Sequence, residues 1–248
     1  MNWWETGAVV SLILALFALL LLAFAPFGWR AGWWHFRFAF TWLMTASGVA
    51  ALAAVIVALG VLLLGWSELS AGRCTMAAIG LVLGAGLVWV PWHYDRVRKT
   101  VPRIHDITTD VENPPEFVAV LPARSAENAA TAVYGGPELA RVQKAAYPDV
   151  APLELPLPAT KAFDLALSVA RSMPGWHIAA TDPTSGRIEA SQTSRWFRFT
   201  DDVVVRVVEH GSGSRVDMRS LSRQGRSDFG VNAARIRLFM AALRKRLG

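Results

Sequence analysis

The chain has 248 residues, of which 53% are hydrophobic, and its 25 basic and 19 acidic side chains give a net charge of +6. This composition averages two unlike parts, because the apolar residues gather in the first 92 positions and the other 156 resemble an ordinary soluble sequence. A wholly soluble chain is therefore excluded. The single cysteine, Cys74, gives no information on the redox compartment.

Three apolar runs open the chain, at Gly7–Phe24, Ala39–Gly65 and Cys74–Trp92, and none contains an Asp, Glu, Lys or Arg. A helix of about 20 apolar residues crosses a hydrocarbon core of roughly 30 Å. Residues 1–94 are therefore predicted to form three transmembrane helices. Most of the 11 tryptophans lie near the ends of these runs, where indole rings prefer the headgroup level. The first run lacks a basic start, which favours a retained helix over a signal peptide.

Two further features of the membrane region predict local structure. The aromatic and basic stretch Arg30–Phe40 is expected to lie along the membrane interface as a short amphipathic helix. The Gly80-x-x-x-Gly84 spacing would let neighbouring helices approach closely. The absence of charged residues inside the spans argues against an ion or proton path, and so against a transport subunit.

The side of the membrane is predicted from Lys and Arg residues in the flanks of the spans. One side carries only Arg73, and the other carries six basic residues: Arg30, Arg37, Arg96, Arg98, Lys99 and Arg103. The expectation is a multi-pass protein of the cell inner membrane with a cytoplasmic C-terminal domain. A periplasmic domain is the alternative, because a long tail can be translocated regardless of its charge.

Residues 95–157 are rich in proline and predict a linker or wrapping segment with only short helices at Ser125–Ala132 and Pro137–Ala146. Residues 158–248 are predicted to form an α+β domain. The helices expected there are Ala159–Ser172 and Val231–Leu247, and the strands are Trp176–Thr181, Arg187–Thr193, Val203–Glu209 and Arg215–Ser222. Turn-like residues at 182–186, 201–202 and 211–214 separate the strands.

This order of elements predicts a two-layer sandwich, in which a four-stranded antiparallel sheet carries two helices on one face. Ile188 and Ala190 alternate with charged or polar residues, as do Val216 and Met218, so that one sheet face is apolar and the other is charged.

Several strings in the soluble region resemble the bacterial family called domain of unknown function 1499. They are Ile104–Asp110, Pro114–Phe117, Tyr147–Asp149, Arg187–Ala190, Phe197–Arg206 and Arg219–Ile236, and the resemblance spans about residues 103–246. The resemblance implies a domain boundary and no activity. It also implies that the domain could lie outside the cytoplasm, because other members are secreted or lipid-anchored.

The strongest candidate site is an arginine cluster before and within the last helix: Arg219, Arg223, Arg226, Ser227 and Arg235. A helix N-terminus exposes unpaired N–H groups, and guanidinium groups around it would hold a phosphate, a carboxylate or a lipid headgroup. The alternative is that the arginines pair with carboxylates inside the fold and that Ser227 or Asp228 caps the helix. Nucleic acid is not expected, because no aromatic residues interleave with these arginines.

A weaker alternative site is the segment holding His105, Asp106 and Asp110, which could serve a membrane-bound hydrolase as a general base. The other histidines of the tail, His177 and His210, do not have metal-ligand spacing, and no nucleophile or phosphate-loop motif occurs. No metal and no cofactor are expected. The sequence leaves enzymatic activity undecided and favours a non-enzymatic role.

The leading hypothesis is therefore an integral membrane protein whose soluble domain acts as a binding or scaffold module for an anionic ligand or an envelope partner. Its expected partners are the lipid bilayer and either an anionic lipid headgroup or an acidic protein.

Overall fold

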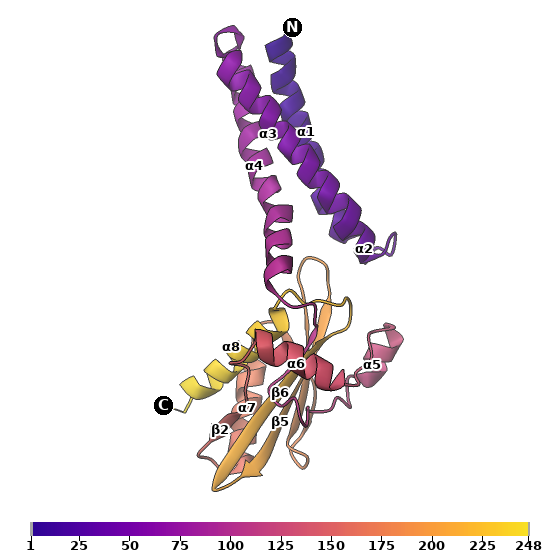
Figure 1. The fold of residues 1–248 in the computed structure, drawn as a ribbon, viewed down its shortest axis with the longest axis vertical. Helices are drawn as coiled ribbons and strands as arrows, with labels where there is room; N and C mark the ends of the chain where they lie inside the picture. Colours follow the sequence, from indigo (N-terminus) through magenta and orange to yellow (C-terminus); the bar gives the residue numbers. More distant parts are fainter. Residues whose placement is uncertain (1, 248) are drawn as a thin grey trace. The chain divides into compact units, whose positions relative to one another are not determined.

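The computed structural model describes residues 2–247, and the chain divides into two compact units after Val97 (Figure 1). The first unit holds helices α1 (Trp3–Arg30), α2 (Phe36–Phe38), α3 (Met44–Leu64) and most of α4 (Ala71–Thr100), with a π-helical turn at Ala39–Leu43 and a 3-10 turn at Trp66–Glu68. Three helical stretches, Trp3–Arg30, Phe36–Leu64 and Ala71–Thr100, are long and apolar enough to span a membrane. The prediction of three helices that are able to span a membrane is confirmed in length and composition.

The expected interfacial helix at Arg30–Phe40 is wrong. The chain turns after α1, with Gly32 at φ +74°, and α2 then runs through the π-helical turn into α3. Trp34 folds back on α1, where its indole N–H donates to the carbonyl of Ala25 at 3.2 Å. Trp33 packs edge-on against Phe27. The aromatic residues therefore close a tight turn between two helices and do not form a separate helix.

Small residues mediate the packing of the long helices within the first unit. Buried positions recur with a spacing of three and four residues, at Ala8, Ser11, Ala15, Ala18, Leu22 and Ala25 on α1 and at Met44, Ser47, Ala51, Ala54, Ala58 and Val61 on α3. This is the heptad spacing of packed helices, and small side chains let the backbones approach. The Ser47 hydroxyl donates to the carbonyl of Ala18 at 2.7 Å across this interface.

The two glycines of the predicted close-approach motif face different helices. A Cβ atom added at Gly80 would lie 2.8 Å from Oγ of Ser11 on α1, and one added at Gly84 would lie 2.9 Å from the carbonyl oxygen of Ala51 on α3. Gly80 and Gly84 therefore let α4 approach both of the other long helices.

The second unit is built on one antiparallel sheet of six strands, where four were predicted. The strands are β1 (Asp106–Thr108), β2 (Leu153–Leu155), β3 (Trp176–Asp182), β4 (Arg187–Thr193), β5 (Thr200–His210) and β6 (Gly213–Ser222). Their order is β1-β6-β5-β4-β3, and β2 also pairs with β6. The four predicted strands are β3 to β6 in consecutive order. The two additional strands come from the proline-rich segment, and each has only three residues, which is too short for an alternation to be detected.

These two short strands share one edge of β6. β2 pairs with its first half, where Leu153 lies opposite Val216, and β1 pairs with its second half, where Asp106 lies opposite Leu221. The segment 95–157 therefore contributes to the sheet and is more than a linker. The expected break at residues 201–202 is also wrong, because Asp201 and Asp202 lie within β5 and the chain turns at Ser194–Phe199.

Four helices accompany the sheet: α5 (Leu121–Ala126), α6 (Gly136–Ala146), α7 (Ala159–Ser172) and α8 (Val231–Lys245). The predicted helices at Pro137–Ala146, Ala159–Ser172 and Val231–Leu247 correspond to α6, α7 and α8. The helix predicted at Ser125–Ala132 begins too late, because α5 starts at Leu121 with a proline in its first turn and ends before Asn128, which has φ +48°.

The main hydrophobic core lies between the apolar sheet face and helices α7 and α8. Ile188, Val205 and Met218 come from the sheet, and Phe163 of α7 and Phe239 of α8 meet them in the same cluster. The ring of Trp176 stacks on Phe239 with 5.6 Å between centroids. The predicted placement of both helices on the apolar face agrees with this core.

The other sheet face is charged, as the alternation indicates, and the proline-rich segment covers part of it. Phe117 and Val120 from the segment before α5 pack on Val204 and Leu221 of this face. The buried carboxylate of Glu189 accepts hydrogen bonds from the backbone N–H groups of residues 118–120, at 2.9 to 3.1 Å. The proline-rich segment thus covers the charged face through both apolar and polar contacts.

Candidate functional site

Arg219, the first of the predicted anion-binding arginines, is directed into the fold. Its side chain is 2% exposed, and its guanidinium donates to both carboxylate oxygens of Asp106 at 2.8 Å. It also donates to the carbonyl oxygens of Pro115 and Ala132, and the rings of Phe117 and Tyr134 lie within 5.4 Å of its central carbon. These contacts use the donors of Arg219 within the protein.

Arg223 is also buried, and it meets the two oxygens of Asp202 at 2.9 and 2.7 Å and Glu127 at 2.5 Å. Arg124 of α5 donates to the same Asp202 carboxylate at 2.7 Å. Burial alone would raise the pKa of Asp202, but hydrogen bonds from Arg223, Ser191 and Arg124 outweigh it and lower the pKa below its usual value. Asp202 is therefore the internal countercharge for two arginines.

Arg235 lies on the sheet side of α8 and is 5% exposed. It donates to Asp201 at 2.7 Å, to Gln192 and Ser220 at 2.8 Å each, and to Asn232 by a short hydrogen bond. Arg235 therefore joins α8 to three strands of the sheet.

The N-terminus of α8 already has a carboxylate. Asp228 accepts hydrogen bonds from the N–H groups of Gly230 at 2.9 Å and Asn232 at 2.8 Å, where an external anion would bind. Burial raises the pKa of Asp228, and these two hydrogen bonds oppose that shift. The hydroxyl of Ser227 accepts from the N–H of Phe229 within the same loop. The contacts at Arg219, Arg223, Arg235 and Asp228 match the internal pairing that the sequence left open as an alternative.

The residues of the weaker alternative site go to different partners. Asp106 binds Arg219, whereas Asp110 accepts from Arg206 at 2.9 Å and from Arg215 at 2.8 Å. The backbone carbonyl of His105 accepts from the N–H of Ser222 and from the amide of Asn232. Within residues 2–247, no three His, Cys, Asp or Glu side chains are grouped closely enough to hold a metal ion.

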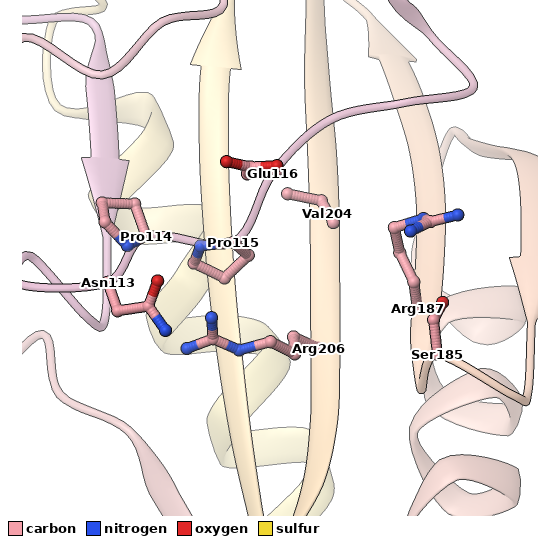
Figure 2. Close-up of a pocket in the computed structure, with 8 residues that line it drawn as sticks. All are labelled: Asn113, Pro114, Pro115, Glu116, Ser185, Arg187, Val204 and Arg206. Atoms are coloured by element: carbon pink, nitrogen blue, oxygen red, sulfur yellow. The ribbon is translucent and has the colours of Figure 1, made fainter.

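A shallow pocket of about 230 Å³ opens on the charged face, between the Asn113–Glu116 segment and strands β4 and β5 (Figure 2). Arg187 and Arg206 line it, but both already pair with carboxylates. Arg187 binds Asp182 and Glu189, and Arg206 binds Asp110 and Asp217. Because four carboxylates surround the two guanidinium groups, this pocket is electrostatically unsuited to an anion.

The remaining predicted residue, Arg226, is exposed and lies at one end of the sheet, which we call the loop end. The loop end consists of Arg103, the β4–β5 loop Ser194–Phe199 and the β6–α8 loop Arg223–Gly230. Backbone hydrogen bonds hold these segments together, from Ser222 N–H to the His105 carbonyl, from Arg223 N–H to the Thr200 carbonyl and from Asp228 N–H to the Ile104 carbonyl. In Figure 1 the loops after β4 and β6 project from the same end of the sheet.

The β4–β5 loop has a defined conformation with an exposed tip. The N–H of Ser194 donates to the carbonyl of Phe199 at 2.8 Å, and the N–H of Phe199 donates back to the Ser194 hydroxyl at 2.9 Å. Phe197 is buried and anchors the loop, whereas Trp196 is 58% exposed. Arg198 has φ +58°, a left-handed conformation that is unfavourable for an arginine.

The loop end carries exposed positive charge. Arg103, Arg195, Arg198 and Arg226 are exposed, and among residues 2–247 they do not form an ion pair within 4.0 Å. The acidic groups nearby, Glu127, Asp201 and Asp228, bind Arg223, Arg235 and the α8 N-terminus respectively. The available charge at this end is therefore basic, with one exposed indole among the arginines.

Sequence reasoning predicted Arg226 and missed Arg103, Arg195, Trp196 and Arg198 as parts of a surface. The signal is present in the string Arg195-Trp196-Phe197-Arg198-Phe199, which combines two basic with three aromatic residues. The sequence pattern places this string between two strands but does not predict which aromatic side chain is exposed, and in the structure Phe197 is buried and Trp196 is exposed. Such a choice between neighbouring aromatic residues is made by tertiary packing.

Comparison with known proteins identifies a family and no activity. The family model described as "Protein of unknown function (DUF1499)" matches residues 106–243, more than half of the chain. No curated protein matches the chain. Among solved structures, the chain matches the crystal structure of TTHA0849 from Thermus thermophilus, with 13% sequence identity and a TM-score of 0.22. The match covers 39% of this chain and 91% of that chain. A TM-score this low does not support an inference about fold or function.

Proposed function

The chain belongs to the DUF1499 family, whose function is unknown, and from that premise we propose that it is a membrane-anchored binding module whose loop end recognises an anionic partner. One observation carries the proposal. The arginines inside the fold have carboxylate partners, whereas those of the loop end face solvent without an ion pair to any described residue. Exposed guanidinium groups gathered on one surface attract phosphate or carboxylate groups.

The anion site proposed here lies on the exposed surface of the loop end, whereas most of the arginines predicted from the sequence are buried. Arg219, Arg223 and Arg235 stabilise the fold through their internal partners, and Arg226 is the one arginine of the predicted set that is exposed at the loop end. Arg103, Arg195 and Arg198 join it there. Among residues 2–247, which the structure describes, this surface does not include an enclosed cavity or a paired nucleophile and base. Binding therefore fits its geometry better than the alternative of hydrolysis by His105, Asp106 and Asp110.

We further propose that the domain faces the cytoplasm. The support is the distribution of Lys and Arg in the flanks of the three apolar helices, six on the side of the soluble domain and one on the other.

The binding proposal is tested by amide hydrogen exchange of the full-length protein in neutral detergent micelles. Added inorganic polyphosphate is expected to slow exchange in the peptides covering Ser194–Phe199 and Arg223–Gly230. An Arg195→Gln, Arg226→Gln double variant should lose this protection and keep its fold, because both side chains are exposed.

The matched control is an Arg141→Gln, Lys161→Gln double variant, which removes two exposed positive charges from α6 and α7. It should retain the protection. Equal loss in the control would mean that net charge alone attracts the polyanion, and no protection in the unmodified protein would refute the proposal.

A further inference from the structure

The soluble domain is connected to the membrane region at its loop end. Helix α4 ends at Thr100 and β1 begins at Asp106, so that five residues join them. The last of these, His105, is hydrogen-bonded to Ser222 where β6 ends, next to the loop that carries Arg226. The chain therefore enters the domain at the same end of the sheet that presents the exposed arginines.

Trp196 is exposed beside this positive charge. An indole ring is apolar over most of its surface and carries one N–H donor, which is why tryptophan prefers the headgroup level of a bilayer. Arginines on both sides of it, Arg195 and Arg198, are exposed and suited to phosphate groups. The loop is held by the Ser194 to Phe199 hydrogen bonds and by buried Phe197, so Trp196 is presented without first having to be ordered.

We propose that the loop end docks on the anionic surface of the bilayer that anchors the chain, with Trp196 at the headgroup level and Arg103, Arg195, Arg198 and Arg226 on lipid phosphates. This inference rests on the proposed function and names its partner. The tether makes docking an intramolecular event, so that a few weak contacts are sufficient for occupancy. Each arginine near an anionic membrane surface is expected to raise the ratio of docked to undocked domain about fivefold.

The surface favours a bilayer over other polyanions for two reasons. A single exposed indole among the described residues of the loop end offers no row of stacking platforms, which single-stranded nucleic acid would need. Arg195 and Arg198 lie on the β4–β5 loop, and Arg226 and Arg103 lie on neighbouring segments of the loop end, and phosphates spread over a bilayer surface suit such separated charges. An acidic protein is the outcome that would remain if soluble polyanions bind and lipid does not.

The test uses the full-length protein in lipid nanodiscs made either of phosphatidylcholine or of an equal mixture of phosphatidylcholine and phosphatidylglycerol. Amide exchange in Arg195–Arg198 is expected to be several-fold slower in the anionic discs. The turn at His210–Gly213 lies at the opposite end of β5 and β6 and should exchange equally in both.

Three variants sharpen the test. Trp196→Ser should lose the protection in anionic discs, and so should the Arg195→Gln, Arg198→Gln double variant. If both arginines contribute fully, the double variant should lower the ratio of docked to undocked domain about 25-fold. The Arg141→Gln, Lys161→Gln double variant should keep it. A second measurement reports insertion directly, with the full-length protein labelled with 5-fluorotryptophan. The fluorine signal of Trp196 is the one that disappears in a Trp196→Phe variant, and nitroxide-labelled lipid should broaden it.

The two proposals fail in distinguishable ways. If exchange is equal in the two kinds of disc and polyphosphate still protects the loops, the loop end binds an anion that is not lipid, and the docking inference is overturned. If neither lipid nor polyphosphate protects the loops, both proposals are overturned.

Discussion

At the scale of single residues, two buried aspartates, Asp202 and Asp228, are expected to make the stability of the domain depend on pH. Asp202 accepts hydrogen bonds from Arg223, Arg124 and Ser191, and its pKa lies below the usual value although burial opposes this shift. A carboxyl group whose folded-state pKa is lowered contributes stability above its unfolded pKa and loses that contribution as the pH falls through the folded pKa. Asp228 has the opposite sign, because burial raises its pKa and its contribution is lost as the pH rises.

Asp202→Asn should destabilise the domain by about 3–5 kcal/mol at neutral pH, because buried Arg124 loses its carboxylate partner and buried Arg223 keeps only Glu127. The difference from the unmodified protein should narrow below the usual pKa range of aspartate, where the native Asp202 is itself protonated. Pulse proteolysis of the full-length chain in detergent across a urea series measures both effects. Glu138→Gln, which removes an exposed partner of Arg141, is the control and should change little. A difference that does not vary with pH would contradict this account.

The sequence predicts that arginines and carboxylates could pair inside the fold, but it does not predict which arginine pairs with which carboxylate. The partner of Arg219 is Asp106, which lies 113 positions earlier in the chain, and the partner of Arg223 is Asp202, across a strand pairing. A sequence shows that arginines and carboxylates are both present. It does not show which carboxylate is buried beside which arginine, because that depends on register and on the path of the covering segment.

At the scale of elements, periodicity predicted the long helices and strands and missed the short ones. Helices α7 and α8 and strands β3 to β6 have enough residues for a repeat of 3.6 or 2 to be recognised. β1 and β2 have three residues each, and they form strands because the edge of β6 offers them unpaired N–H and carbonyl groups. Their structure is therefore tertiary in origin.

The glycines of two hairpin turns allow a test of this level. A Cβ at Gly186, which has φ +65°, would collide with the carbonyl oxygen of Val207, whereas one at Gly211, with φ +57°, would meet no described atom within 4 Å. Gly211→Ala should cost about 1 kcal/mol from backbone conformation alone. Gly186→Ala should cost about 3 kcal/mol or more, because β5 must also move. Urea unfolding of the two full-length variants compares them, and equal losses would show that the close approach is not rigid.

At the scale of the whole molecule, we expect the domain that follows the three apolar helices to lie in the cytoplasm, and protein fusions test this prediction. Alkaline phosphatase fused after the last residue is expected to be inactive, because that enzyme folds only outside the cytoplasm and the flanking charges predict a cytoplasmic domain. A green fluorescent protein fusion at the same position should fluoresce, as the complementary control. An active phosphatase fusion would contradict the prediction of a cytoplasmic domain.

The shared edge of β6 has a consequence for the order in which the domain can be completed during synthesis. β1 and β2 leave the ribosome long before β6, with which both strands pair. Asp106, for example, cannot reach its paired position until Leu221 has been synthesised. Contacts between residues this distant in sequence slow folding, because the entropy cost of closing a long loop comes before the contacts contribute any favourable free energy. Until β6 emerges, β1 and β2 have no strand edge to pair with, and Phe117 and Val120 lack Leu221, one of the two sheet residues in their cluster. A nascent chain that stalls in the last strand would thus remain anchored by its apolar helices while its soluble domain was still open to proteases.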